Sequence, residues 1–270
     1  MSGEARPRYS AVLICHEEDP IDCEGIATWL AHDFSLSGIV LLRDPPGAIW
    51  RKLRSEYRRV GLLRLIDVIL FRLFYRLRQA AKDALWVRDT VQDLRERYPA
   101  KLDKVPTLRA LHPNSEEVRA FIKLLQPDFA LARCKYILKP QIFALPRHGT
   151  YVLHPGICPA YRNAHGCFWA LVNRDLKRVG MTLLKVDDGI DTGPVYLQAS
   201  YTFDEKRESH VVIQHRVVLE NLDAIAEVLR QLCEGRAQPK SLAGEPSRNW
   251  GQPWLSGYLR WQRRLRTELV

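Results

Sequence analysis

Residues 8–47, RYSAVLICHEEDPIDCEGIATWLAHDFSLSGIVLLRDPPG, contain the alternation that decides the fold class. A short apolar run rich in Val and Ile over 9–15 predicts a buried strand. Asp and Pro then precede apolar residues at helical spacing, which predicts a helix over about 19–34. A second apolar run ends at two consecutive prolines. The order strand, helix, strand predicts a parallel α/β sheet.

The same alternation resumes beyond residue 110. Helices are expected over 112–126, 140–149, 164–175 and 208–235, and strands within 127–138, 150–156, 179–188 and 191–198. The last helix is expected to be continuous and amphipathic. The tail over 236–270 contains three Trp and many basic residues, without clear periodicity. No G-x-G-x-x-G or P-loop motif follows the first strand, so dinucleotide binding and P-loop phosphate transfer have no motif support.

A basic insertion over about 49–104 interrupts this alternation. Its pattern is helical, and residues 51–104 hold 15 Lys/Arg against 7 Asp/Glu, within a chain of net charge +10. A basic excess favours phosphorylated metabolites, nucleic acid or lipid headgroups as partners and selects none of them. Two interpretations stay open: helices that lie on the sheet with solvated arginines, or a surface for a membrane, an anionic substrate or a partner subunit.

The cellular compartment is predicted from what the sequence lacks. The first residues contain no apolar stretch of signal-peptide type, and no run reaches the roughly 18 apolar residues of a spanning helix. Six cysteines occur without a C-x-x-C pair. Reduced thiols and a cytoplasmic location are therefore expected.

Residues 151–169, YVLHPGICPAYRNAHGCFW, are the first candidate for chemistry. Open α/β sheets bind ligands in loops at the carboxyl ends of their strands, and His154 follows such a strand. An imidazole there suits proton transfer, although a structural histidine is the commoner case. A zinc site built from His154, Cys158, His165 and Cys167 has no common ligand spacing, so no metal is expected. Cys158 as a nucleophile lacks a local signature.

Residues 185–198, KVDDGIDTGPVYLQ, are the second candidate. Three aspartates and two glycines are typical of an ordinary capped turn. Alternatively, if this loop folds back toward His154, a carboxylate orients the imidazole and raises its basicity, as in catalytic triads.

Taken together, HPGICPAYRN, WALVNRD and VGMTLLKVDDGIDTGPVYLQ resemble the folate-dependent formyltransferases. This family includes the glycinamide ribonucleotide, methionyl-tRNA and amino-sugar N-formyltransferases, with the pattern N-x-H-P-S-L-L-P-x-Y-R-G and a later D-x-G-P. The resemblance implies a Rossmann-like, mostly parallel α/β sheet that carries no dinucleotide. The expected organisation is a formyltransferase-like domain over 1–235, with the helical insertion at about 49–104, and a basic tail over 236–270.

The resemblance also implies site residues. His154 matches the catalytic histidine of the family and Asp191 its catalytic aspartate. Arg162 has a substrate-anchoring interpretation and a structural one. The segments matching those that bind 10-formyltetrahydrofolate comprise Cys134, Lys135, Tyr136, Ile137 and Leu138, and Val186, Asp187, Asp188, Gly189 and Ile190.

The sequence departs from the family at Val152, where the pattern has a catalytic asparagine. Losing one oxyanion donor typically costs about 2.7–4 kcal/mol of transition-state stabilisation. Three explanations stay open. Asn163 or His165 supplies the donor; the reaction is slower or different, such as hydrolysis of formyltetrahydrofolate; or a catalytically degenerate binding protein remains.

The expected activity is transfer of a formyl group from 10-formyltetrahydrofolate to a primary amine of a small molecule, such as an amino-sugar nucleotide or a specialised metabolite. A phosphorylated acceptor suits the basic charge. A tRNA acceptor is not expected, because only 35 residues follow Gly235. The insertion leaves open a peripheral membrane contact or a homo-oligomer.

Overall fold

One seven-stranded sheet organises the protein. The computed structural model describes residues 9–267 apart from the side chains of residues 49 and 52, so 1–8 and 268–270 of the predicted domain and tail lie outside the described residues. The strand order is β3-β2-β1-β4-β5-β6-β7. The strands are β1 (Ser10–His16), β2 (Ser35–Leu42), β3 (Thr107–Ala110), β4 (Phe129–Arg133), β5 (Thr150–His154), β6 (Met181–Lys185) and β7 (Val195–Ala199). β1 to β5 are parallel to one another, and β6 pairs antiparallel with both β5 and β7. This arrangement confirms the predicted mostly parallel α/β sheet.

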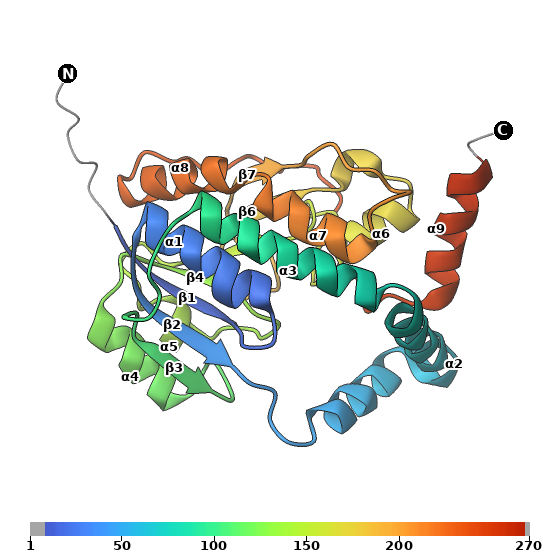
Figure 1. Ribbon diagram of the computed structural model, residues 1–270, viewed down its shortest axis with the longest axis horizontal. Helices are drawn as coiled ribbons and strands as arrows, with labels where there is room; N and C mark the ends of the chain where they lie inside the picture. The colour runs from blue at the N-terminus through green and yellow to red at the C-terminus, as the bar shows by residue number, and fades with distance from the viewer. Residues whose placement is uncertain (1–8, 268–270) are drawn as a thin grey trace.

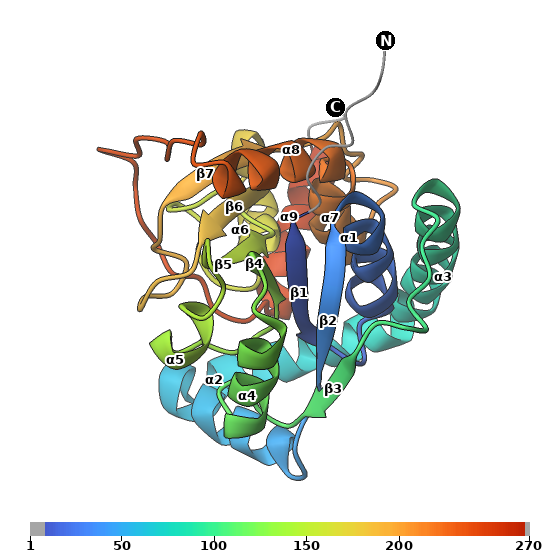
Figure 2. The same ribbon diagram turned by 90° about the vertical axis from the view of Figure 1, so that its left-hand side faces the viewer.

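Helices cover both faces of this sheet (Figures 1 and 2). They are η1 (Ile21–Ile26), α1 (Ala27–Asp33), α2 (Ala48–Arg78), α3 (Ala80–Arg97), α4 (Glu116–Leu125), α5 (Pro140–Phe143), α6 (Gly166–Val172), η2 (Leu176–Arg178), α7 (His210–Leu219), α8 (Leu222–Cys233) and α9 (Leu255–Thr267). Successive side chains of β1 enter different cores, because side chains alternate across a strand. Leu13 packs with α1 and α6 to α9, whereas Val12 and Ile14 pack with α4 and α5.

The strand order reverses between β1 and β4, so loops leave their carboxyl ends in opposite directions and open a ligand crevice there. A buried ion pair ties this edge together. Arg133, at the end of β4, places Nε 2.8 Å from Oδ1 of Asp22 and donates from Nη1 to the Leu153 carbonyl at 2.6 Å. Burial raises the pKa of Asp22 to about 6, although Arg133 opposes that shift. Arg133 thus joins η1 to the strand end that carries His154.

The helix predicted over 208–235 is not continuous, and that prediction was wrong. The chain breaks into α7 and α8 near Asn221, whose side-chain amide donates to the carbonyls of Val217 and Ser200. Such bonds compete with the helical ladder and favour a break. The strand β3 was not expected either. It has only four residues, of which one is buried, so it lacks the apolar run by which the other strands were predicted.

The tail, in which no regular structure was expected, forms α9 and packs into the main core. Tyr258 and Trp261 lie three residues apart on one helix face and are 6% and 1% exposed. The Trp261 indole donates from Nε1 to Glu205 at 2.7 Å. α9 stands beside α2 in Figure 1, and the two helices are in contact.

We expect Trp261→Ala to lower the free energy of unfolding by about 3–5 kcal/mol, because it leaves a cavity in a packed core. Leu259→Ala on the same helix removes a side chain that is 47% exposed and should cost less than about 0.5 kcal/mol. Urea denaturation measures both values. Equal effects would show that α9 does not belong to the cooperative core.

Candidate active site

His154 ends β5 and is the centre of the site, with only 3% of its surface exposed. Its Nε2 lies 3.0 Å from the Asn163 carbonyl and 3.3 Å from Oδ2 of Asp191. Its Nδ1 lies 3.1 Å from the Gly156 carbonyl and 3.7 Å from Sγ of Cys158. Carbonyl oxygens only accept hydrogen bonds, so this environment favours a ring that is protonated on both nitrogens. Burial alone lowers the pKa of His154, but Cys158, Asp191 and the Gly156 carbonyl outweigh it and raise the pKa to about 10.

Asp191 and Asn163 meet His154 in an unusual backbone conformation. Both lie in the left-handed region, with φ of 51° and 77°. Asn and Asp are the non-glycine residues that adopt this region most readily. The turn directs the backbone N–H of Asn163 to Oδ2 of Asp191 at 2.7 Å, the same oxygen that faces His154. The Asp191 side chain is 16% exposed, which makes it the more accessible member of the pair.

The HPG turn holds the imidazole from the other side. A Cβ on Gly156 would lie 2.7 Å from Cε1 of His154 and from the Tyr161 carbonyl, so a side chain there would displace the ring. Thr182, opposite His154 in the antiparallel register, donates from Oγ1 to the Gly156 carbonyl at 2.7 Å. The same hydroxyl accepts from the backbone N–H of Cys158 at 3.0 Å. These contacts place the Gly156 carbonyl against Nδ1.

The tail forms part of the site, which the sequence reasoning missed. Its segment around Trp250 pairs with the backbone of 159–162: Arg162 donates to the Arg248 carbonyl and accepts from the Trp250 N–H. The side chain of Asn163 donates to the Trp250 carbonyl at 2.8 Å. The Trp250 indole stacks with Tyr161 and with Trp169, with ring centroids 5.4 and 5.3 Å away. The three tryptophans of the tail were the available signal, but their partners lie far away in the chain: Ala160 is 90 residues from Trp250, and Glu205 is 56 residues from Trp261.

His165 lies at the start of α6 in a different electrostatic environment. Burial lowers its pKa to about 4, and the positive charges of Lys135 and Arg72 act in the same direction, while a hydrogen bond with Gln252 opposes them. The ring is therefore neutral at pH 7, with one donor and one acceptor nitrogen. His154 and His165 come from one short segment and differ in charge.

The two segments predicted to hold the formyl donor share one apolar cluster. Cys134 and Tyr136 from the first and Val186 from the second pack against it, together with Val152 of β5. The first segment is anchored by Asn114, which donates from its side chain to the Ile137 carbonyl. Ile137 and Ile190 are 59% and 38% exposed, so each segment presents an apolar side chain to solvent.

Within the second segment, Asp187 closes the turn by accepting from the Gly189 N–H and the Thr192 hydroxyl. Gly193 is required there, because a Cβ would collide with the Lys185 carbonyl. Asp188 and Gly189 are exposed.

Comparison with known proteins identifies the family. A sequence profile described as formyl transferase matches residues 84–229, just over half of the chain. The chain belongs to the formyl transferase family. A methionyl-tRNA formyltransferase of Thermodesulfovibrio yellowstonii is 32% identical over 125 residues, covering 46% of this chain and 40% of that protein. The chain thus spans well under half the length of that relative.

Solved structures of low sequence identity show the same fold. The phosphoribosylglycinamide formyltransferase of Anaplasma phagocytophilum is similar with a TM-score of 0.55 at 12% identity, covering 92% of this chain and 100% of that one. A sugar N-formyltransferase of a Shewanella species gives 0.52 at 16% identity, covering 90% and 76%. The predicted family and Rossmann-like fold are thereby confirmed.

The remaining predicted residues, Val152, Arg162 and Asn163, lie in β5 and in the loop that follows it. Arg162 donates from Nη1 to the Ile190 carbonyl at 3.2 Å, so its guanidinium braces the second donor segment. Val152 lies two residues before His154 on the same face of β5 and packs against Leu184 and Cys158. Asn163 contributes its backbone to the His154–Asp191 contact and its amide to the tail.

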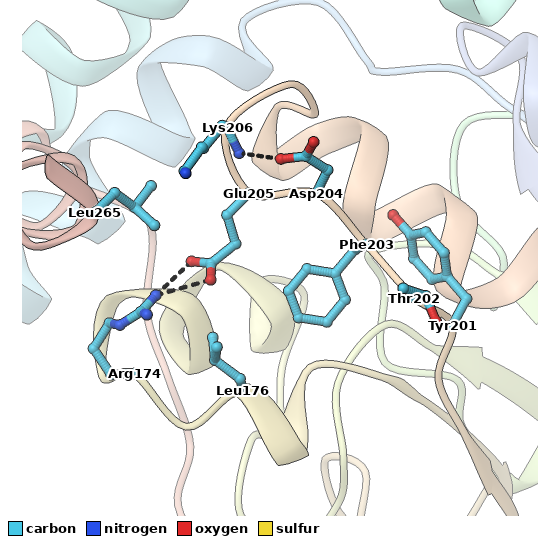
Figure 3. Close-up of a pocket in the computed structure, with 9 residues that line it drawn as sticks. All are labelled: Arg174, Leu176, Tyr201, Thr202, Phe203, Asp204, Glu205, Lys206 and Leu265. Atoms are coloured by element: carbon cyan, nitrogen blue, oxygen red, sulfur yellow. Dashed lines mark hydrogen bonds and ion pairs between the residues drawn. The ribbon is translucent and has the colours of Figure 1, made fainter. Parts of the chain in front are cut away.

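A cavity of about 590 Å³ is lined by residues of the α6–η2 turn, the β7–α7 loop and α9, including the Arg174–Glu205 ion pair (Figure 3). Neither His154 nor Asp191 lines it. Among residues 9–267, no three His, Cys, Asp or Glu side chains gather as metal ligands, and Cys167 instead donates to the Gly180 carbonyl.

We expect the stability of this protein to depend on pH through His154. A folded-state pKa near 10, above the ordinary 6.5, means that the protonated ring stabilises the fold fully below pH 6.5 and progressively less as the pH rises toward 10. The difference in unfolding free energy between the native protein and His154→Gln should be largest below pH 6.5 and shrink toward pH 10. Urea titrations across this range measure it.

The exposed His112 provides the matched control, since His112→Gln removes an imidazole at the surface and should change the unfolding free energy only slightly. A difference for His154→Gln that grows with pH would contradict a protonated, carboxylate-paired ring.

Proposed function

We propose that this protein transfers a formyl group from 10-formyltetrahydrofolate to a primary amine of a small molecule. The observation that carries the proposal is the 3.3 Å contact between the buried imidazole of His154 and the carboxylate of Asp191, at the carboxyl end of a sheet strand in a formyl transferase. Amine attack on a formyl carbon creates a negative oxygen and leaves a surplus proton on nitrogen. The pair offers one positive and one negative group for these two needs.

His154 supplies the positive charge. A pKa near 10 keeps the ring protonated at neutral pH, so its charge stabilises the developing oxyanion without a proton transfer. Its ring N–H groups are already directed at carbonyl and carboxylate oxygens. His154 therefore acts mainly by its charge and by orienting Asp191.

Asp191 is the group that meets the acceptor. Its Oδ2 is engaged by His154 and by the Asn163 N–H, and the carboxylate is partly exposed. A positioned carboxylate takes the proton from the attacking nitrogen directly or through one water, and returns it to the folate nitrogen when the bond from that nitrogen to the formyl carbon breaks. The bond to Asn163 holds the carboxylate in place while it does so.

His165 is the side chain that we propose as the replacement for the amide missing at Val152. The Asn163 amide is occupied by the Trp250 carbonyl, whereas His165 is a neutral imidazole with one N–H, which acts on the oxyanion by exchanging its hydrogen bond with Gln252 for one to that oxygen. The charges of Lys135 and Arg72 add to burial in lowering its pKa, so two cations act on this part of the site. Positive charge at this point suits an acceptor that carries a phosphate or carboxylate group besides its amine.

We expect Asp191→Asn to lower kcat by about 10²–10⁴-fold with little change in KM, because a positioned proton acceptor is lost. The measurement is release of tetrahydrofolate from 10-formyltetrahydrofolate with a panel of primary amines. Asp103→Asn, an exposed change away from the site, should leave the rate unaltered. Turnover without any amine would show that water is the acceptor, and the absence of turnover in the native protein under all conditions would reject the proposal.

We expect His165→Ala to lower kcat by about 10²–10³-fold, as the loss of one oxyanion donor does. Introducing Val152→Asn in the His165→Ala protein should restore part of the rate, because an amide returns two residues before His154. The same folate assay measures all three proteins. An unchanged rate in His165→Ala would remove this residue from the reaction.

A further inference from the structure

We propose that α2 docks the protein onto an anionic membrane surface. The docking face is a stripe of seven exposed aliphatic side chains, hereafter the α2 stripe: Leu62, Leu63, Ile66, Ile69, Leu70, Leu73 and Leu77. Their exposed fractions run from 42% for Ile69 to 85% for Leu63. Single exposed apolar residues are ordinary on protein surfaces, but a contiguous patch marks an interaction site.

The stripe occupies one side of the helix. At 100° per residue, its members fall within an arc of about 120°. Val68 and Phe71, which are 2% and 5% exposed, point to the opposite side and pack into the protein. One face of α2 therefore packs against the rest of the protein, and the other face is exposed to solvent.

The positive charge around the α2 stripe indicates that its partner is an anionic membrane surface. α2 carries nine Lys/Arg against two Asp/Glu, and both acids are already engaged, Glu56 with Arg59 and Asp67 with Arg64. Arg72 and Arg76 are exposed along one margin of the stripe. α9, which packs beside α2, adds four arginines and no acid. A basic helix with an apolar face binds the interface of an anionic bilayer.

A second copy of the chain fits this face less well. Two α2 helices packed stripe to stripe would bring two strongly basic surfaces together, and like charges across an interface disfavour binding. Anionic headgroups instead supply the opposite charge. Within residues 9–267, no helix is both long and apolar enough to cross a membrane, so the contact is with the surface.

The first part of α2 supports the same assignment. The helix breaks at Gly61, whose φ of 76° and ψ of 174° separate two pieces. Trp50 and Tyr57 lie seven residues apart in the first piece and are 78% and 51% exposed. Trp and Tyr are the aromatic residues that favour the level of the lipid headgroups.

The position of α2 links this face to the site. β2 leads into α2 after a short loop, and its carboxyl end lies at the same edge of the sheet as those of β1, β4 and β5 (Figures 1 and 2). A protein docked through α2 would hold this edge near the headgroups. The family match begins at residue 84, so α2 lies outside the matched segment.

Vesicle co-sedimentation of the full chain tests the proposal. We expect binding to vesicles of equal parts phosphatidylglycerol and phosphatidylcholine, little binding to pure phosphatidylcholine, and weaker binding as salt rises. The triple variant Leu63→Gln, Leu70→Gln, Leu77→Gln should lower the partition coefficient by about tenfold or more, because it removes apolar contact from the stripe.

The matched control replaces three exposed leucines elsewhere, Leu85→Gln, Leu111→Gln and Leu124→Gln, and should bind as the native protein does. Circular dichroism and thermal unfolding verify that both triple variants fold. Equal vesicle binding by the two variants, or no binding by the native protein, would overturn the proposal.

Sedimentation velocity tests whether the α2 stripe binds a second copy of the chain instead of a membrane. A native dimer that the stripe variant converts to monomer, together with failure to bind anionic vesicles, would assign the face to a second copy and reject membrane docking. None of these readouts depends on formyl transfer, so the two proposals stand or fall separately.

Discussion

A protonated imidazole buried at the end of β5 constrains everything around it. Burying a charge is costly unless its hydrogen-bonding groups are paired. At His154 the acceptors come from the Gly156 carbonyl, the Asn163 carbonyl and the Asp191 carboxylate. Gly156 lies against the ring, and Asn163 and Asp191, which supply two of these acceptors, both adopt the left-handed backbone region.

The same segment holds two histidines with opposite protonation. His154 faces oxygens and stays charged, whereas desolvation and the charges of Lys135 and Arg72 lower the pKa of His165, which stays neutral. Environments that push two pKa values apart assign different roles to identical side chains. Val152 leaves the face of β5 that carries His154 without the hydrogen-bonding group of the family's asparagine. The neutral His165 is the donor that we propose in its place.

The sheet edge connects this chemistry to the outer surface. Arg133 joins η1 and β5 beneath the site, and the β2 chain leaves the same edge to form α2. The tail contacts both the outer helix and the site. α9 packs against α2, and the Trp250 indole donates to the Ala160 carbonyl in the loop after His154. Elements outside the matched family segment therefore surround a site built from elements inside it.

The sequence by itself determined the sheet class, most helix positions and the identity of the candidate pair. These are local signals: apolar periodicity, the Ser115 cap of α4, and two motifs that carry His154 and Asp191. Tertiary structure alone decided that the two motifs meet, that Asn163 is held by the tail, and that residues 208–235 break into two helices. It also decided which face of α2 is covered, because Phe71 and Leu70 are equally apolar in sequence, and only contacts distant along the chain bury one and expose the other.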